Sequence, residues 1–205
     1  MTSIETRPKS VLNNECKMVV ADAVRHILSA IGEDANRDGL QKTPDRVARM
    51  YDELLEGYVT DPAELLNGAL FDVEYDQMVI VKDIEFYSMC EHHMIPFFGY
   101  VHVGYLPSDK VVGLSKIPRL VDMFAKRLQV QERMTHQVAE FLGTMINPRG
   151  VGVVIEATHL CAVMRGVKKH HTKMVTSAMI GEFRKNVTTR DEFMAHIRHQ
   201  GGNLL

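Results

Sequence analysis

The feature that most constrains the fold is a run of short apolar stretches between Phe71 and Val112. These stretches are rich in β-branched and aromatic residues, and Gly, Pro, Ser or Asp separates them, a pattern typical of antiparallel strands. Two more such stretches follow nearer the C-terminus. The sequence therefore predicts an antiparallel sheet with strands near residues 71–73, 78–81, 84–87, 97–105, 111–112, 151–157 and 174–183.

Helical spacing of apolar residues occurs before the first strand and again between the strands. Gly32 supplies a stop for the first helix, and Thr43-Pro44 is typical of an N-cap followed by proline at the first helical position. We therefore predict an α+β protein in which a helical region, residues 1–67, precedes a second region, residues 68–205. The predicted helices cover residues 10–31, 43–55, 115–128 and 131–146, with one more near the C-terminus.

A cluster of potential metal ligands interrupts the predicted sheet. The run Cys90-Glu91-His92-His93 falls in a loop between two predicted strands, and loops held by rigid strands commonly carry site residues. A second group, His159 and Cys161, follows a later strand. Thiolates and neutral imidazoles are ligands that Zn²⁺ takes, so the sequence indicates a metal site.

Three kinds of site fit this cluster. The spacing Cys90-x-x-His93 with the distant Cys161 supplies three protein ligands, the number typical of catalytic zinc. The cluster could also hold no metal. A closed structural zinc site needs a fourth ligand, for which three histidines compete: His92, His159 and His170. In a catalytic site, two thiolates would acidify water less than three imidazoles do, so proton-transfer residues are needed. His92 and His159 are the candidates, because histidine titrates near neutral pH.

Cationic side chains gather at three places. Lys116 and Arg119 lie near the start of a predicted helix, where backbone N–H groups and the helix dipole attract negative charge. Since acidic residues are the stabilising choice there, a phosphate ligand would explain both cations, and a merely tolerated basic surface is the alternative. Arg165 follows the second ligand group. Arg46 and Arg49 share one face of the second predicted helix, which a solvated basic face explains equally well.

The composition argues against some classes of protein. A formal charge of −2 gives no overall attraction to nucleic acid or to an anionic membrane. No apolar run is long enough to span a bilayer, and the N-terminus has no apolar secretion signal. Two of the three cysteines stand close to histidines, which favours ligands or free thiols over disulfides. We therefore expect a soluble cytoplasmic protein without nucleic-acid or membrane partners.

Four motifs occur in a fixed order along the chain: Cys90-Glu91-His92-His93, Gly113-Leu114-Ser115-Lys116-Ile117-Pro118-Arg119, Gln129-Val130-Gln131-Glu132-Arg133 and Cys161-x-x-Met164-Arg165-Gly166. Together they closely resemble the zinc-dependent type of GTP cyclohydrolase I. The resemblance extends from about Thr43 to His196 and is far more specific than any one motif.

This resemblance implies an enzyme that hydrolyses GTP at C8, releases formate and recloses the ring to 7,8-dihydroneopterin triphosphate, at the entry to folate and other pterins. It implies that Cys90, His93 and Cys161 hold Zn²⁺, while His92 and His159 handle protons. These roles fit the chemistry, because protonation of N7 makes C8 more electrophilic and zinc activates the attacking water.

The resemblance also implies how GTP is bound. Glu132 resembles the family's guanine-binding carboxylate, which accepts N1–H and the 2-amino group together, a contact that adenine cannot supply. Gln131 beside it helps to orient the base. The triphosphate is bound by Ser115, Lys116, Arg119 and Arg165, with Arg46 and Arg49 contributed by a neighbouring subunit. Glu91 has no single implied role, since its carboxylate positions either the substrate or a histidine.

The family's tunnelling fold pairs antiparallel strands with helices on one face, and five subunits close their sheets into a barrel. Two such rings form a homodecamer with active sites at subunit interfaces. The resemblance therefore implies a homo-oligomer of this kind.

Two places depart from the family's pattern, Ala162 after the zinc cysteine and the pair His170-His171, and both affect the pocket wall or the affinity for metal. Other enzymes of the same fold fit less well. Pterin synthases use three histidines for zinc, and the nitrile reductases of queuosine synthesis lack the Cys-Glu-His-His arrangement. The alternative from another class is a non-catalytic zinc protein that binds an anionic partner.

Overall fold

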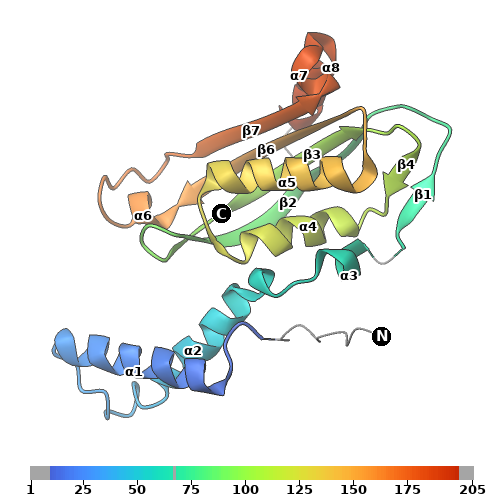
Figure 1. Cartoon of the computed structure of the whole chain (residues 1–205). Helices are drawn as coiled ribbons and strands as arrows, with labels where there is room; N and C mark the ends of the chain where they lie inside the picture. Colours follow the sequence, from blue (N-terminus) through green and yellow to red (C-terminus); the bar gives the residue numbers. More distant parts are fainter. Residues whose placement is uncertain (1–9, 67, 199–205) are drawn as a thin grey trace, which may run out of the picture. The chain divides into compact units, whose positions relative to one another are not determined.

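The computed structural model describes residues 10–66 and 68–198, and Figure 1 shows their helices and strands. The chain divides into two compact units, Met1–Thr60 and Asp61–Leu205. The predicted boundary lies between residues 67 and 68, next to Asn67, which is outside the described residues.

The first unit is a pair of packed helices, α1 (Asn14–Ala30) and α2 (Thr43–Leu54), followed by the 3₁₀ turn η1 (Glu56–Tyr58). The side chain of Asn13 caps α1, and Gly32 follows the helix with a φ of +86°, a left-handed conformation that suits glycine. The N-cap prediction for Thr43 is wrong, because Lys42 already has near-helical dihedral angles and takes the N-cap position without a side-chain bond.

The second unit is built on a sheet in the order β5-β2-β3-β6-β7. Its strands are β2 (Val79–Cys90), β3 (Ile95–Leu106), β5 (Leu128–Gln129), β6 (Gly150–His159) and β7 (Met174–Gly181). All neighbours pair antiparallel except β2 and β5, which are parallel. A second, two-stranded sheet joins β1 (Leu70–Asp72) to β4 (Lys110–Val112), and α3 (Pro62–Leu66) precedes it.

Two of the predicted strands, 78–81 and 84–87, are parts of the single strand β2. A β-bulge shifts the register with β3 between Val81 and Ile84, and Asp83 has a φ of +58°. The backbone N–H of Asp83 donates to Nδ1 of His102 on β3 at 3.1 Å. The side chain therefore replaces the ladder bond that the bulge removes, and the strand continues through residues that resemble a turn.

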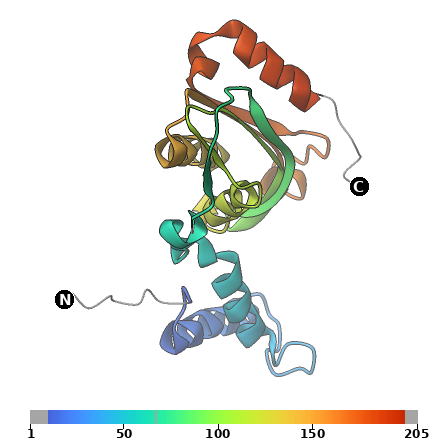
Figure 2. The same ribbon diagram turned by 90° about the vertical axis from the view of Figure 1, so that its right-hand side faces the viewer.

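The main core lies between the sheet and the helices α4 (Lys116–Ala125) and α5 (Gln131–Ile146), which cover one face. Figure 2 shows the sheet curving around these helices. Alternate residues of the central strands point into this core, as Val103 and its cross-strand partner Val153 do, while both helices turn an apolar face toward them. The observed bounds of α5 match the predicted helix.

The last helices, α7 (Glu182–Lys185) and α8 (Val187–Arg198), pack on the opposite face near one end of the sheet, where Phe183 and Phe193 join a smaller apolar cluster. A Cβ at Gly104 would lie 2.8 Å from the Phe193 ring, and one at Gly152 only 2.5 Å from Phe183. Glycine is required at both positions because the aromatic rings pack directly on the strand backbone.

The predicted α+β class is confirmed, with helices before an antiparallel sheet whose large helices cover one face. Among the described residues, no helix combines the length and the apolar character needed to cross a membrane.

Candidate metal centre

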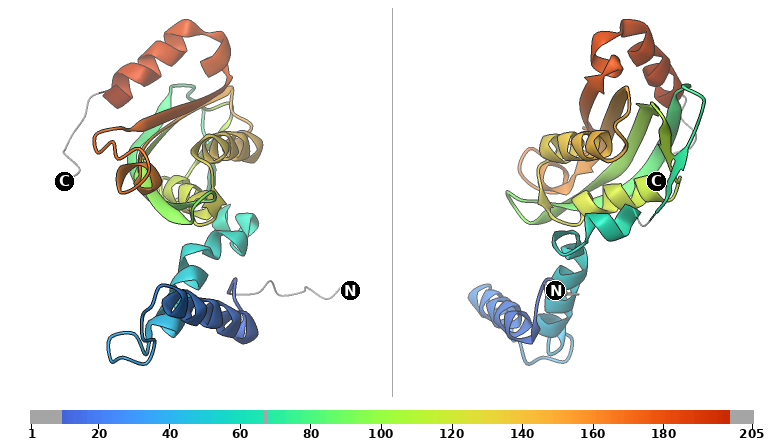
Figure 3. Two further views of the ribbon diagram at one scale, coloured as in Figure 1. Left: turned by 90° about the vertical axis from the view of Figure 1, so that its left-hand side faces the viewer. Right: turned by 45° about the vertical axis from the view of Figure 1, so that its right-hand side comes forward.

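Two cysteines and a histidine from distant parts of the sequence meet where β2 and β6 end. Cys90 is the last residue of β2 and pairs with Ile95, while His159 is the last residue of β6 and pairs with Phe97. Because β3 lies between these strands, the register brings Cys90 and His159 to the same end of the sheet. Cys161 follows on the short helix α6 (Leu160–Val163), which Figure 1 and Figure 3 show beside the β2–β3 loop.

The ligand atoms of Cys90, His159 and Cys161 all lie within 4.8 Å of one another. Cys90 is buried, the other two are half-buried, and both thiols are free. Burial raises the pKa of Cys161, and the neighbouring Cys90 raises it further. Two close thiols and an imidazole form a donor set that suits Zn²⁺, whose charge stabilises the thiolate forms that burial disfavours.

A buried hydrogen-bond network holds His159. Its Nε2 lies 2.8 Å from Oε1 of Gln131, a fully buried side chain at the start of α5. The Gln131 amide nitrogen donates to the carbonyls of Ile155 and Met174 and to the Thr176 hydroxyl. Oε1 is therefore the acceptor, and His159 carries its proton on Nε2, which leaves Nδ1 with a free lone pair.

Two further contacts define the state of His159. Its ring stacks on that of Phe97, with centroids 4.5 Å apart. Burial lowers its pKa, and the negative charge of Glu132 opposes this in part. The structure thus favours a neutral imidazole of fixed orientation, with the exposed carboxylate of Glu132 close enough to influence it.

The other two histidines are exposed in the loop after Cys90. Nδ1 of His92 lies 3.8 Å from Sγ of Cys90. His93 lies outside the compact group of three, and its Nε2 accepts a hydrogen bond from Arg165 at 3.2 Å. The structure therefore brings together the predicted ligands Cys90 and Cys161, with His159 in place of the predicted His93.

The predicted anion-binding residues of α4 lie at the first turn of that helix. Ser115 occupies the N-cap position, but its side chain makes no capping bond, and the first turn contains no acidic residue. Ser115 and Arg119 are exposed, and Lys116 is half-buried. Arg165 lies in the segment after α6.

Arg46 and Arg49 belong to the first unit. Both are exposed on α2, and Arg49 lines a cavity of 480 Å³ between α1 and α2. Their relation to the metal centre is a matter of assembly and stays a prediction.

Sequence reasoning gave no role to Arg133, although the residue belongs to one of the four motifs. Both of its terminal nitrogens donate to the carboxylate of Glu91, at 2.6 and 2.9 Å. These hydrogen bonds lower the pKa of Glu91. The signal available in the sequence was the position of each residue, one next to Cys90 and the other next to Glu132.

The fold and the site define a class of protein: an α+β chain whose sheet carries, at one end, a group of two thiols and an imidazole able to hold a metal ion. The family model of GTP cyclohydrolase I matches residues 20–198. The chain belongs to the GTP cyclohydrolase I family.

Relatives named GTP cyclohydrolase 1 cover most of the chain. The relative from Gloeobacter violaceus is 55% identical over 87% of this chain and 84% of its own. That from Wolinella succinogenes is 53% identical over 89% and 98%, and that from Chlorobaculum tepidum 56% over 85% and 78%. A solved structure, the archaeosine synthase QueF-Like in the apo form, is 19% identical and covers 53% of this chain and 97% of its own. Its TM-score with this chain is 0.43.

Proposed function

We propose that this chain hydrolyses GTP at C8, releases formate and recloses the ring to 7,8-dihydroneopterin triphosphate, the first step toward tetrahydrofolate and other pterins. The observation that carries the proposal is the convergence of Cys90, His159 and Cys161 at the end of the sheet, in a chain of this family. The motifs around these residues supply the groups that the reaction needs.

The metal in this proposal is Zn²⁺, held by Cys90, Cys161 and one histidine. We assign that histidine to His93, which completes the Cys90-x-x-His93 motif of the family, and reserve His159, whose Nε2 is bonded to Gln131, for proton transfer. His93 lies in the loop next to Cys90 and is exposed. Bound zinc would supply a Lewis acid that polarises the attacking water, with two thiolates acidifying it less than three imidazoles would.

This ligand assignment is tested by the zinc content of two variants. We expect His93→Ala to lose zinc and His159→Ala to retain it. The reverse result would assign the metal to the three residues that the structure groups together and would leave His93 to bind substrate.

The two remaining histidines serve proton transfer. Burial lowers the pKa of His159, and Gln131 accepts the proton on Nε2, so in the neutral ring the lone pair of Nδ1 can accept a proton from the attacking water. His92 is exposed beside Cys90 and donates a proton to N7 of the purine, which makes C8 more electrophilic. Gln131 acts through His159 by fixing its tautomer.

Glu132 recognises the base. Its carboxylate is exposed at the first turn of α5 and close enough to His159 to influence its pKa. In this role it accepts the N1–H and 2-amino groups of guanine together. Adenine offers neither group at these positions, so ATP would leave the carboxylate desolvated and without partners.

The triphosphate binds at the start of α4 and beside the metal centre. The hydroxyl of Ser115 is not engaged in capping, and the absence of an acidic residue from the first turn leaves the positive end of the helix to Lys116 and Arg119. Arg165, beside His93, completes this group. Arg46 and Arg49 complete the site from a neighbouring subunit.

We propose a homodecamer of two pentameric rings with active sites at subunit interfaces. Among the described residues, the outer edge of β7 has no strand partner, and neither has the outer edge of β2 between Val79 and Ser88. Open edges of this length favour pairing with another chain. A mass in solution of ten times 23.2 kDa is expected, and a stable monomer would contradict the assembly.

The free cysteines accord with a reducing compartment, and we propose that the enzyme acts in the cytoplasm. One observation favours a second candidate function, a non-catalytic zinc protein that binds an anionic partner. If His93 joined the group of Cys90, His159 and Cys161, the four would close the coordination shell.

Incubation of the zinc-loaded protein with GTP separates the two functions. The enzyme produces formate and, after oxidation, a fluorescent pterin. Tight retention of zinc without either product would favour the non-catalytic protein. ATP serves as the matched control and is expected to give neither product.

A further inference from the structure

Glu91 and Arg133 join the two halves of the candidate site. Glu91 lies between Cys90, the last residue of β2, and His92, in the loop that carries two imidazoles. Arg133 directly follows Glu132, in the first turn of α5. Their hydrogen bonds are bidentate, at 2.6 and 2.9 Å, and so restrain both distance and orientation.

A backbone contact also holds the two segments side by side, next to the ion pair. Cys90 pairs in parallel with Gln129, and the N–H of Glu91 donates to the Gln129 carbonyl at 3.0 Å. This pairing is short, because β5 contains only two residues and α5 begins two residues later. The ion pair therefore adds a second attachment just beyond the point where strand pairing ends.

The exposure of the pair indicates that folding is not its main role. The side chains of Arg133 and Glu91 remain 47% and 31% exposed. An ion pair in contact with water contributes little to stability, since solvent screens it. A bidentate contact at this place has more effect on geometry than on the stability of the fold.

We propose that Glu91 and Arg133 are positioning residues that hold the loop of His92 and His93 at a fixed geometry to the guanine-binding turn of α5. The inference rests on the proposed function, which places proton transfer on one side of this contact and base recognition on the other. Glu91 then has a role through Arg133, and its carboxylate makes no contact with substrate.

The first test is Glu91→Gln in the full chain, loaded with zinc and assayed with GTP. The substitution keeps the shape of the side chain and removes the bidentate partner of Arg133. We expect kcat to fall about tenfold, because small displacements of reacting groups have large effects on rate. We expect KM to stay within about twofold, since the groups that bind GTP are unchanged.

Restoration of the contact with exchanged charges is the second test. The double variant Glu91→Arg/Arg133→Glu should recover at least part of the activity that each single substitution loses. Arg133→Lys keeps the charge without the bidentate geometry and should lie between the wild type and Glu91→Gln. Zinc content and thermal midpoint should equal those of the wild type in Glu91→Gln.

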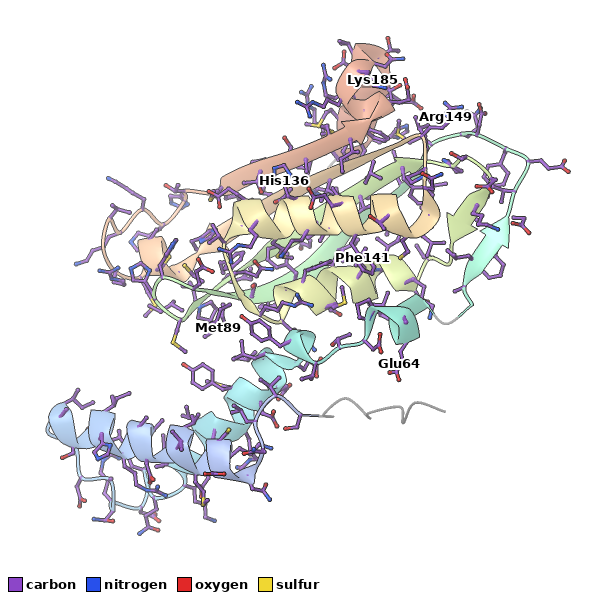
Figure 4. All side chains as sticks on the ribbon, in the orientation of Figure 1. Glu64, Met89, His136, Phe141, Arg149 and Lys185 are labelled. Atoms are coloured by element: carbon purple, nitrogen blue, oxygen red, sulfur yellow. The ribbon has the colours of Figure 1, made fainter. Side chains whose placement is uncertain are left out.

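Asp76→Asn is the matched control. It removes the partner of Arg149, an ion pair with a 2.9 Å contact in which the arginine is as exposed as Arg133 and the carboxylate is more exposed than that of Glu91. Figure 4 labels Arg149 and Met89 at opposite ends of the sheet, and Met89 adjoins Cys90. Asp76→Asn should leave kcat and KM unchanged.

Three outcomes would overturn the positioning role. Wild-type kinetics in Glu91→Gln would show that the contact has no effect on the reaction. A raised KM with unchanged kcat would make Glu91 a substrate ligand, and loss of zinc would make it a support of the metal. Absence of product from the wild-type protein would instead refute the proposed function itself.

Discussion

Nε2 of His159 donates to Oε1 of Gln131 at 2.8 Å, and this contact, together with the bond from Gln131 to the Ile155 carbonyl, joins β6 to the start of α5. Three acceptors surround the Gln131 amide nitrogen, which fixes the orientation of the amide so that Oε1 faces His159. Oε1 can only accept, so His159 must carry its proton on Nε2. The buried side chain of Gln131 thus fixes the orientation of His159, the residue to which we assign proton transfer.

Gln131→Met should destabilise the protein by about 1–3 kcal/mol, because it leaves buried acceptors without their donor. GTP turnover should fall as well, since His159 loses the partner that orients it. Denaturant unfolding at a fixed protein concentration measures the first effect. Thr144→Ala, an exposed position on the same helix, is the control and should change stability by less than about 0.5 kcal/mol. Equal stability of the two variants would contradict the role of the network.

Gly152→Ala should destabilise the packing of α7 and α8 on the sheet by about 1–3 kcal/mol, because the added Cβ would lie 2.5 Å from Phe183. Gly143→Ala is the opposite case. Nothing lies within 4 Å of its added Cβ, and the position is in α5, where alanine is favoured over glycine. Thermal unfolding should therefore show a lower midpoint for the first variant and an equal or higher midpoint for the second. The same sign of change in both would refute this packing account.

His102 should make stability fall as the pH drops below its ordinary pKa of 6.5. Burial lowers the pKa of His102 in the folded chain, although Asp83 and Glu156 oppose this. Between the lowered value and 6.5 the unfolded chain binds more protons, so stability is complete above 6.5 and declines toward the lower value.

The variant His102→Asn tests this prediction. Its amide oxygen can still accept from the Asp83 N–H, but it does not titrate, so the decline in stability between pH 7 and pH 5 should become shallower. His136→Asn, at an exposed position on α5 that Figure 4 labels, serves as the control. An unchanged pH dependence in His102→Asn would contradict the prediction.

Asp52 should protect the backbone of Leu12 from hydrogen exchange. Lys17, the Leu12 N–H and Ser10 all bond this carboxylate, and they lower its pKa from 3.8 to about 2. A carboxylate with a lowered pKa stabilises the fold above its unfolded value, so protection should decline as the pH falls from 3.8 toward 2. Asp52→Asn should speed exchange at Leu12 at neutral pH, and a wild-type exchange rate there would refute the assignment.

The periodicity of apolar residues was sufficient to predict elements such as α5, whose bounds depend on neighbouring residues. The apolar spacing of α5 predicted its bounds, and Cys161 lies just beyond the end of β6, as expected. The loop expected around Cys90 begins only after that residue, because β2 extends to Cys90. The break predicted within β2 was wrong because a distant side chain, His102, satisfies the N–H that the bulge frees. No local pattern contains that information.

The roles of individual site residues were harder to predict from the sequence, because they too depend on contacts between distant residues. Gln131 was expected to orient the base, yet its side chain is fully buried and bonded to His159 and to two strands. Glu91 had two open roles, and its partner Arg133 lies 42 residues away in sequence. Such pairings follow from the strand register and from helix placement, which the whole fold determines.

Zinc content and formate release, measured on the same preparations of three proteins, test the central claim most directly. The wild type should hold zinc and release formate from GTP, Cys161→Ala should lose both, and His92→Ala should keep zinc while losing turnover. Release of zinc from His92→Ala, or formate from zinc-free Cys161→Ala, would contradict the account.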